Sequence, residues 1–302
     1  MRAETLVIVN PVAGGGYAQR CSGAVARYFA EQGLRVAFAQ SRSSDDLRRQ
    51  AATAARDGVR DILALGGDGA VHYLVEALFG TDARAGILPA GNGNDIARSL
   101  GIPLDPLRAA EAFLRARPRS IDVVRATFRA GPPAHYVAGG GMGLDAEAAY
   151  RAGTTFKDWP GVTRYLAGAL AAFNGAAFTL TAHIDGIRWS GRTLLAVGAN
   201  APYYGAGIRI APNAEMDDGW LDVLVVRDAP WTRLIEAIPI LLTSGDLRFE
   251  EVERFRCRRV RLEGDRPVKV HGDGELLGES PVELEIVPNA VDIMVPRAVQ
   301  SV

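Results

Sequence analysis

The stretch Asp61-Ile-Leu-Ala-Leu-Gly-Gly-Asp-Gly-Ala70 predicts a strand, a glycine turn and the start of a helix, in that order. Its apolar run Ile62–Leu65 is typical of a strand buried in a parallel sheet. The glycines of the turn Gly66–Gly69 let backbone N–H groups approach a phosphate closely, and the helix from Ala70 points its positive end at it. Asp68 would repel a phosphate unless a cation lies between them, so the stretch predicts a metal–nucleotide site. The alternative is a tight strand-to-helix turn in which Asp68 caps the helix.

Length and composition limit the class of protein. A chain of 302 residues, 48% of them hydrophobic, predicts two domains with a core in each. The formal net charge of −1 argues against broad nucleic-acid binding, which needs a basic surface. The two cysteines, Cys21 and Cys257, provide neither a disulfide framework nor a zinc cluster. The strand-like run Leu6–Val9 leaves no room for a signal peptide, and no stretch is apolar enough to span a bilayer, so we expect a cytoplasmic protein.

Short apolar strands alternate with helical patterns in the first part of the chain. The strands are expected at Leu6–Val9, Val36–Ala39, Ile62–Leu65 and Gly86–Leu88, and the helices at about Ala18–Glu31, Asp45–Arg56, from Ala70 onward and at about Asn94–Leu100. Such a βαβ series implies an α/β domain, a parallel sheet with helices on both faces. Asp105-Pro106 opens one more helix as its N-cap and first residue. We assign residues 1–124 to this domain, with residues 288–302 as a candidate completion.

The second part, residues 125–287, has the pattern of a mainly antiparallel β domain. Strands are expected at Val123–Phe128, Tyr136–Gly139, Phe178–Ile184, Ile187–Ser190, Thr193–Gly198, Leu221–Val226, Arg258–Leu262, Val268–Val270 and Val282–Val287. Asp185-Gly186 is a strong hairpin signal between two of them. Only Val162–Phe173 and Trp231–Thr243 look helical in this half.

Two further glycine-rich loops follow strands of the α/β domain. Asn10–Gly16 comes after the first strand, and Pro89–Asp95 comes after the strand that ends at Leu88. Ligands of open parallel sheets bind beyond the carboxyl ends of the strands, so three such loops would meet at one edge. The Asn10–Gly16 loop taken alone is equally well explained as a plain strand-to-helix connection. Neither a P-loop motif nor a G-x-G-x-x-G motif is present.

Two acidic segments in the β domain are candidate metal-binding or catalytic sites. The segment Ile210–Asp222 concentrates carboxylates before a strand, and hard oxygen ligands of this kind suit Mg²⁺ or Ca²⁺. An acidic hairpin turn explains this segment equally well. The segment His271–Glu275 predicts a β-hairpin, and a carboxylate at its tip can act as a general base toward a hydroxyl. Spacing alone does not choose between a structural and a catalytic role there.

Taken in order, these pieces resemble the diacylglycerol kinase catalytic family, in particular its soluble bacterial lipid kinases. The resemblance covers nearly the whole chain. It is carried by Asn10-Pro11, Gly66–Gly69, Gly91–Asp95, Gly139–Asp145, Gly205–Gly207, Asp217–Gly219 and Asp273–Glu275. It implies a Rossmann-like three-layer α/β domain followed by a β-sandwich, the arrangement that NAD kinases share. It also implies an enzyme that uses ATP and Mg²⁺ to phosphorylate a lipid hydroxyl of the diacylglycerol type.

The resemblance also implies a role for particular residues. Glu275 would be the general base, with Asp273 beside it, and Asp68 would position the catalytic metal and the phosphates. A structural Mg²⁺ would be held by the backbone carbonyls of Glu215 and Trp220 and by the Asp218 carboxylate. The nucleotide would be bound by Asn10, Ser41, Gly66, Gly67, Asp68, Gly69, Ala70, Val71, His72, Gly91, Asn92, Asn94 and Asp95.

Two positions depart from the family pattern. Ala70 and Asn92 each stand where the family usually has a threonine, so two hydroxyls expected to face phosphate are missing. Losing a hydrogen bond to a charged group costs about 1.5–3 kcal/mol, which would weaken ATP binding without abolishing it. Asn92 still offers an amide donor, whereas Ala70 offers none.

A lipid kinase without a transmembrane segment must reach its substrate at the inner membrane surface. Two segments could make this contact: the arginines between Arg254 and Arg261 in one expected strand, and the apolar helix Trp231–Leu242. A charged edge strand and a helix packed on the sandwich are the structural alternatives. Two other functions stay open, a kinase for a soluble metabolite such as NAD and a nucleotide-binding regulator without catalysis. The sequence identifies neither the lipid nor the oligomeric state.

Overall fold

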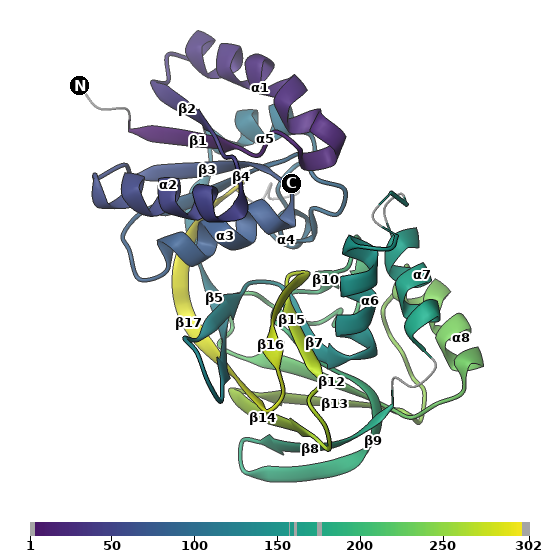
Figure 1. Cartoon of the computed structure of the whole chain (residues 1–302). Helices are drawn as coiled ribbons and strands as arrows, with labels where there is room; N and C mark the ends of the chain where they lie inside the picture. Colours follow the sequence, from purple (N-terminus) through teal and green to yellow (C-terminus); the bar gives the residue numbers. More distant parts are fainter. Residues whose placement is uncertain (1–3, 157, 160–161, 174–176, 298–302) are drawn as a thin grey trace, which may run out of the picture. The chain divides into compact units, whose positions relative to one another are not determined.

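A computed structural model describes residues 4–156, 158–159, 162–173 and 177–297 of the chain (Figure 1). The chain divides into two compact units. Unit 1 is formed by Met1–Ile121 with Asn289–Val302, and unit 2 by Asp122–Pro288. The chain passes from one unit to the other within β5 (Arg117–Phe128) and returns within β17 (Val282–Val295).

Unit 1 is a three-layer α/β domain, as predicted. Its elements in chain order are β1 (Thr5–Val9), α1 (Ala13–Glu31), β2 (Val36–Gln40), α2 (Ser44–Arg56), β3 (Asp61–Gly66), α3 (Asp68–Leu78), β4 (Arg84–Pro89), α4 (Asp95–Ser99) and α5 (Pro106–Phe113). The strand order is β17-β4-β3-β1-β2, and these neighbours pair in parallel. Helices α1 and α5 cover one face of the sheet, and α2 and α3 cover the other (Figure 1).

Apolar burial explains why these strands form the centre of the unit. The side chains of Ile62–Leu65 have no exposed surface, and neither do those of Val7 and Ile8 on the neighbouring strand. A strand buried on both faces is apolar at every position, which is the pattern that predicted β3. The expected helix at Asp105-Pro106 is also confirmed: the Asp105 carboxylate accepts hydrogen bonds from the backbone N–H groups of Leu107 and Arg108.

Unit 2 is mainly antiparallel β structure, again as predicted. Its elements are β6 (Ala134–Tyr136), β7 (Gly139–Gly143), α6 (Leu144–Gly153), α7 (Thr163–Ala172), β8 (Phe178–Ile184), β9 (Ile187–Ala199), β10 (Tyr203–Tyr204), β11 (Ile208–Arg209), β12 (Leu221–Arg227), α8 (Trp231–Leu241), β13 (Val252–Cys257), β14 (Arg259–Gly264), β15 (Lys269–Gly272) and β16 (Glu275–Glu279). The long strand β9 pairs antiparallel with β7, β8 and β12. The buried core that these strands share includes Tyr136, Met142 and Phe178.

Three expectations for this half were wrong in detail. Helix α6 was not expected, since only Val162–Phe173 and Trp231–Thr243 look helical in the sequence of this half. The two strands expected at Ile187–Ser190 and Thr193–Gly198 form one strand, β9, which continues through Gly191. The arginine-rich strand is two strands, β13 and β14, with a break at Arg258.

The hairpin expected at Asp185-Gly186 is confirmed. Both residues have positive φ, 44° and 90°, as a two-residue turn of the mirror-image type requires. Among the helices that the structure describes, none combines the length and the apolar character needed to cross a membrane.

Candidate active site

The register of the parallel sheet brings four predicted residues into one row. Val9 pairs with Gln40 on one side and with Leu65 on the other, and Gly66 pairs with Pro89. The next row toward the carboxyl ends of the strands therefore contains Ser41 after β2, Asn10 after β1, Gly66 at the end of β3 and Pro89 at the end of β4. The three glycine-rich loops therefore leave the same edge of one sheet, which is the arrangement that the sequence predicted.

Direct contacts between glycines join these loops. A Cβ on Gly67 would lie 3.0 Å from the Gly91 Cα, and a Cβ on Gly91 would lie 2.4 Å from the Gly67 Cα. A Cβ on Gly14 would lie 2.3 Å from the carbonyl oxygen of Ala90. The backbones of the first and third loops, and of the second and third, are thus too close for any side chain at these positions. Glycine here is a packing requirement, in addition to any role toward a phosphate.

Asn94 fixes the shape of the third loop. Its side-chain oxygen accepts a hydrogen bond from the Gly91 N–H at 2.9 Å, and its amide nitrogen donates to the Gly91 carbonyl, also at 2.9 Å. The residue is buried and has a left-handed backbone, φ 57°. The Asn94 amide is thus already used to close its own loop. Asn92 is exposed at the outside of the same loop, so its amide is the more accessible one.

Asp68 links the second loop to the third. Its Oδ1 accepts a hydrogen bond from the backbone N–H of Ile96, in the first turn of α4, at 3.0 Å. The carboxylate therefore lies at the start of two helices, α3 and α4, where the positive ends of both dipoles favour a negative charge. This contact gives Asp68 a structural role that is compatible with holding a cation.

The other predicted nucleotide residues differ in how accessible they are. The Ser41 hydroxyl is buried and donates to the Val9 carbonyl at 3.2 Å. Ala70, Val71 and His72 lie in the first turns of α3 and are buried as well. The His72 ring packs edge-on against Tyr73 at 4.9 Å between centroids. These side chains stabilise the loop, so the groups left to meet a ligand are mainly backbone N–H groups.

The predicted metal segment in unit 2 is a loop held by a buried aspartate. Asp122 has no exposed surface; its Oδ2 accepts from the Gly219 N–H at 2.7 Å, and its own N–H donates to the Met216 carbonyl at 2.6 Å. Asp218 Oδ1 accepts from the Trp220 N–H at 2.9 Å, and its Oδ2 pairs with Arg256. Asp122 is not among the predicted residues, although an aspartate inside the apolar run Ile121–Val124 is a signal that could have identified it.

The donors in this loop fit a hard cation such as Mg²⁺. They are one carboxylate, that of Asp218, and the carbonyls predicted from Glu215 and Trp220, which is the oxygen-only chemistry that Mg²⁺ prefers. Burial raises the pKa of the nearby Asp222, the Arg256 charge lowers it, and the Asp218 charge raises it. A divalent cation would act as Arg256 does and offset the repulsion between the two carboxylates. Among the described residues, no group of three or more Asp, Glu, His or Cys side chains is placed to hold a metal, so backbone carbonyls would have to contribute.

The segment His271–Glu275 forms the predicted hairpin, β15–β16. Asp273 and Gly274 make its turn, with φ values of 51° and 88°. The Asp273 carboxylate accepts hydrogen bonds from the N–H groups of Val137 at 2.7 Å and Ala138 at 2.8 Å. It therefore fixes the turn to the segment between β6 and β7. Glu275 follows as the first residue of β16, half-buried and paired with Gly272.

A buried polar cluster behind this hairpin had been assigned no role from the sequence. His271 Nε2 lies 2.7 Å from Asp145 Oδ2 and 2.9 Å from the Tyr204 hydroxyl, which also bonds to Asp145. His271 is only 2% exposed. The Gly139–Gly143 strand makes room for this cluster, since a Cβ on Gly141 would lie 2.8 Å from Asp145 Oδ2. The glycines of β7 thus serve close packing between strands.

Comparisons with known proteins agree with this geometry. The diacylglycerol kinase catalytic domain model matches residues 4–126, and the model of the YegS C-terminal NAD kinase beta sandwich-like domain matches residues 140–295. The diacylglycerol kinase of Mycobacterium tuberculosis (strain ATCC 25618 / H37Rv) is 31% identical over 301 residues, which cover 97% of this chain and 96% of that protein. The chain belongs to the diacylglycerol kinase family.

Solved structures support the same fold. The crystal structure of a diacylglycerol kinase from Bacillus anthracis str. Sterne superposes with a TM-score of 0.78 at 22% identity, covering 98% of this chain and 97% of that one. At this identity the likeness concerns the fold alone. Membership of the family, shown by the domain models and the mycobacterial relative, makes this protein a kinase of the lipid-kinase class.

Three of the five arginines between Arg254 and Arg261 form ion pairs with described residues. Arg256 pairs with Asp218, Arg259 with Glu283 and Glu285, and Arg261 with Glu263. Strand β13 pairs with β12 alone among the described strands. Strand β14 instead lies between β8 and β17, so of the two alternatives that the sequence left open, the charged edge strand fits β13 alone.

The hairpin predicts that substitutions of Asp273 and Glu275 differ in their effect on the free energy of unfolding. Asp273→Ala removes two charge-assisted hydrogen bonds and leaves buried N–H donors without a partner, so we expect the free energy of unfolding to fall by about 2–4 kcal/mol. Glu275→Gln on the same hairpin should change it by less than about 0.5 kcal/mol. Urea unfolding followed by circular dichroism measures both. Equal stability of the two variants would show that Asp273 does not anchor the turn.

Proposed function

We propose that this protein is an ATP-dependent lipid kinase that transfers the γ-phosphate to the hydroxyl of a diacylglycerol-like lipid. The observation that carries the proposal is the convergence of three glycine loops at one sheet edge in unit 1 of a diacylglycerol kinase family chain. The lipid type is inferred from the name of the mycobacterial relative.

The proposed nucleotide-binding site holds the phosphates mainly through backbone groups. Phosphoryl transfer needs little covalent help from the protein and depends on positioning and on neutralising charge. The N–H groups of the Gly66–Gly69 turn and the N-terminal end of α3 would hold the phosphates. Contacts among glycines keep these groups in place before the ligand arrives, so little ordering is needed on binding. Ala70 adds no hydroxyl, and we therefore expect weaker ATP binding than a threonine at that position would give.

Mg²⁺, when bound, would supply positive charge that screens the phosphates and the carboxylates near it. Asp68 is the residue of unit 1 that we propose to orient a cation toward the phosphates. In unit 2 the Asp218 carboxylate, with the carbonyls of Glu215 and Trp220, would hold a structural cation. Arg256 neutralises Asp218 in the structure described here, so a cation would compete with this arginine for the carboxylate.

Glu275 is the proposed general base. It is half-buried at the start of β16, directly after the turn that Asp273 holds, so its backbone is fixed while its side chain keeps access to a substrate. We propose that its carboxylate accepts the proton of the lipid hydroxyl as the hydroxyl oxygen bonds to the γ-phosphorus, while the bond from that phosphorus to the β,γ-bridging oxygen breaks and ADP leaves. Base catalysis of this kind contributes about 10²–10⁴-fold to the rate. Asp273 would assist by positioning the turn.

Turnover of ATP with a panel of acceptors tests this function. We expect phosphate transfer to a lipid hydroxyl in mixed micelles, and a loss of about 10²–10⁴-fold in kcat for Glu275→Gln with little change in nucleotide affinity. Transfer to NAD and to no lipid would contradict the proposal. Nucleotide binding without transfer to any acceptor, unchanged by Glu275→Gln, would instead indicate a regulator, which the missing hydroxyl at Ala70 would fit.

The proposed metal loop makes a separate prediction. Asp218→Ala removes the only carboxylate among the proposed ligands, so the Mg²⁺ concentration that gives half-maximal activity should rise by about tenfold or more. The control is Arg256→Gln, which breaks the same ion pair but keeps the carboxylate, and it should leave the Mg²⁺ requirement unchanged or lower it. If Asp218→Ala leaves both the Mg²⁺ dependence and the activity unaltered, the assignment of this loop is wrong.

A further inference from the structure

Glu275 lies on a strand whose position depends on a single neighbour. Strand β16 is at the end of its sheet, and β15 is its one partner among the described strands. The position of Glu275 is therefore set by whatever fixes β15 to the rest of unit 2. The Asp273 carboxylate fixes the turn that joins the two strands, and His271 lies two residues earlier, within β15 itself.

A β-bulge in this hairpin decides the direction of the Glu275 side chain. The register of β15 with β16 shifts between Val270 and His271, so Leu277 is an extra residue of β16 without a pairing partner on β15. Side chains alternate between the two faces of a strand, and one extra residue shifts this alternation by one. In a hairpin without the bulge, Glu275 would therefore point to the opposite face. The bulge lies opposite His271.

Packing holds the residues on both sides of the bulge. Leu277 packs against the buried core of unit 2, and Gly272 leaves room for it, since a Cβ on Gly272 would lie 2.8 Å from Leu277 Cδ1. His271 is held by polar contacts instead. Its Nε2 lies 2.7 Å from Asp145 Oδ2 and 2.9 Å from the Tyr204 hydroxyl, which bonds to the other Asp145 oxygen. Only 2% of the His271 surface is exposed, so these contacts are shielded from water.

The surroundings of the imidazole also assign its proton. His271 Nδ1 is buried and has no hydrogen-bond partner among the described residues. A proton on Nδ1 would be a buried donor without an acceptor, whereas a proton on Nε2 can be donated to Asp145. We therefore assign the proton to Nε2. The contact with Asp145 needs an N–H group at the Nε2 position and makes no use of Nδ1.

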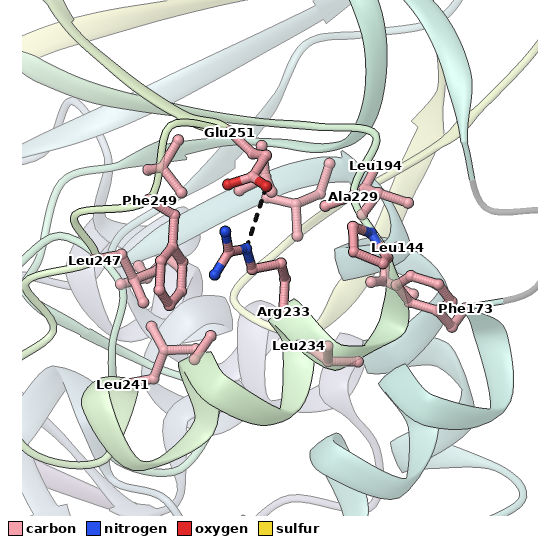
Figure 2. A pocket seen from close by; sticks show the side chains of 16 residues that line it. Leu144, Phe173, Leu194, Ala229, Arg233, Leu234, Leu241, Leu247, Phe249 and Glu251 are labelled. Carbon is pink, nitrogen blue, oxygen red and sulfur yellow. Dashed lines mark hydrogen bonds and ion pairs between the residues drawn. The ribbon is translucent and has the colours of Figure 1, made fainter.

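Asp145 is itself fixed at the start of α6. It lies in the first turn of this helix, whose positive end favours a carboxylate. The residue before it, Leu144, is buried in the wall of an apolar cavity of about 80 Å³ between α8 and the strands β9 and β12, together with Leu194 and Phe173 (Figure 2). Leu144 thus anchors the helix start in apolar surroundings, while Asp145 contacts His271.

A second contact between β15 and α6 is exposed and contributes less. Lys269 Nζ pairs with Glu147 Oε2 at 3.2 Å and lies 4.1 Å from the centroid of the Tyr150 ring. The paired side chains of Lys269 and Glu147 are 38% and 30% exposed, and solvent screens ion pairs of this kind. The buried contact between His271 and Asp145 is therefore the stronger link from β15 to α6.

We propose that His271 is a positioning residue for the general base: its bond to Asp145 holds β15 at the bulge and so keeps the Glu275 carboxylate directed toward the substrate hydroxyl. The inference rests on the proposed function, because it takes Glu275 as the base. His271 acts through Glu275 and not on the substrate itself. A misplacement of about 1 Å can cost about 10²-fold in rate, so loss of this bond should lower kcat while nucleotide binding is kept.

Two amide substitutions test which nitrogen makes the contact. The side-chain amide of glutamine can reach the position of the histidine Nε2, whereas that of asparagine reaches only the position of Nδ1. We expect His271→Asn to lower kcat by about tenfold or more, with KM for MgATP changed by less than about twofold, and His271→Gln to stay within about threefold of the wild type. Lys269→Gln, on the same strand, is the matched control and should leave kcat unchanged. Steady-state kinetics with dioctanoylglycerol as the acceptor measures all three.

The same substitution in a Glu275→Gln background shows whether His271 acts through the base. There we expect His271→Asn to lower kcat by less than about twofold, because the group that it positions is already gone. A merely structural loss would reduce kcat equally in both backgrounds. Equal losses, or a wild-type kcat for His271→Asn, would overturn the inference and leave the kinase intact. Tyr204→Phe, which removes one hydrogen bond to Asp145, takes the place of His271→Asn in both backgrounds if that variant does not fold.

Hydrogen exchange separates this inference from the proposed function. Exchange of the backbone amides of residues 269–279, measured by mass spectrometry, reports on the hairpin without any acceptor lipid. We expect it to be about tenfold faster in His271→Asn than in the wild type, and unchanged in His271→Gln and Lys269→Gln. If the protein shows this pattern but phosphorylates no lipid, the proposed function fails and the role of His271 in holding the hairpin stands. Unchanged exchange in His271→Asn would overturn that role.

Discussion

The arrangement of unit 1 depends on the contact between two glycine backbones, Gly67 after β3 and Gly91 after β4. Neither position can carry a Cβ without moving the other loop. The reciprocal hydrogen bonds of Asn94 with Gly91 and the bond from Ile96 to Asp68 then fix the loops around this contact. A set of backbone N–H donors held in this way loses little conformational entropy when it binds a phosphate. The other loops of the proposed nucleotide-binding site depend on this contact, because it sets where the start of α3 lies relative to the third loop.

Much of this arrangement could be predicted from the sequence, because it depends on local patterns that short segments carry. The apolar run Ile62–Leu65 indicates a buried parallel strand, and parallel strands place their carboxyl ends together, so the loops at Asn10, Gly66 and Pro89 had to converge. Sequence could not show that the Asn94 amide closes its own loop, or that the Ser41 hydroxyl is turned to the Val9 carbonyl. Those bonds depend on exact side-chain geometry.

Unit 2 was harder to predict, since its site residues are organised by long-range contacts. Asp122 holds the loop before β12 from nearly one hundred residues away in the chain, and Asp273 holds its hairpin by bonding to residues between β6 and β7. The strand expected at Tyr136–Gly139 is wrong in its bounds: Gly139–Gly143 form β7, which lets Asp145, Tyr204 and His271 meet. Helix α8 was expected either to face a membrane or to pack on the sandwich; one side lines a pocket and the other is exposed.

The most direct test of this account is the affinity of the Gly91→Ala protein for MgATP, measured by isothermal titration calorimetry. The new Cβ would lie 2.4 Å from the Gly67 Cα and 2.9 Å from Asn94 Oδ1, so the two loops must separate. The account predicts that Kd rises by about tenfold or more, which corresponds to about 1.4 kcal/mol. Gly23→Ala, in α1 with open space around its Cβ position, should bind as the wild type does. A Gly91→Ala protein that folds and binds MgATP with unchanged affinity would contradict the central claim.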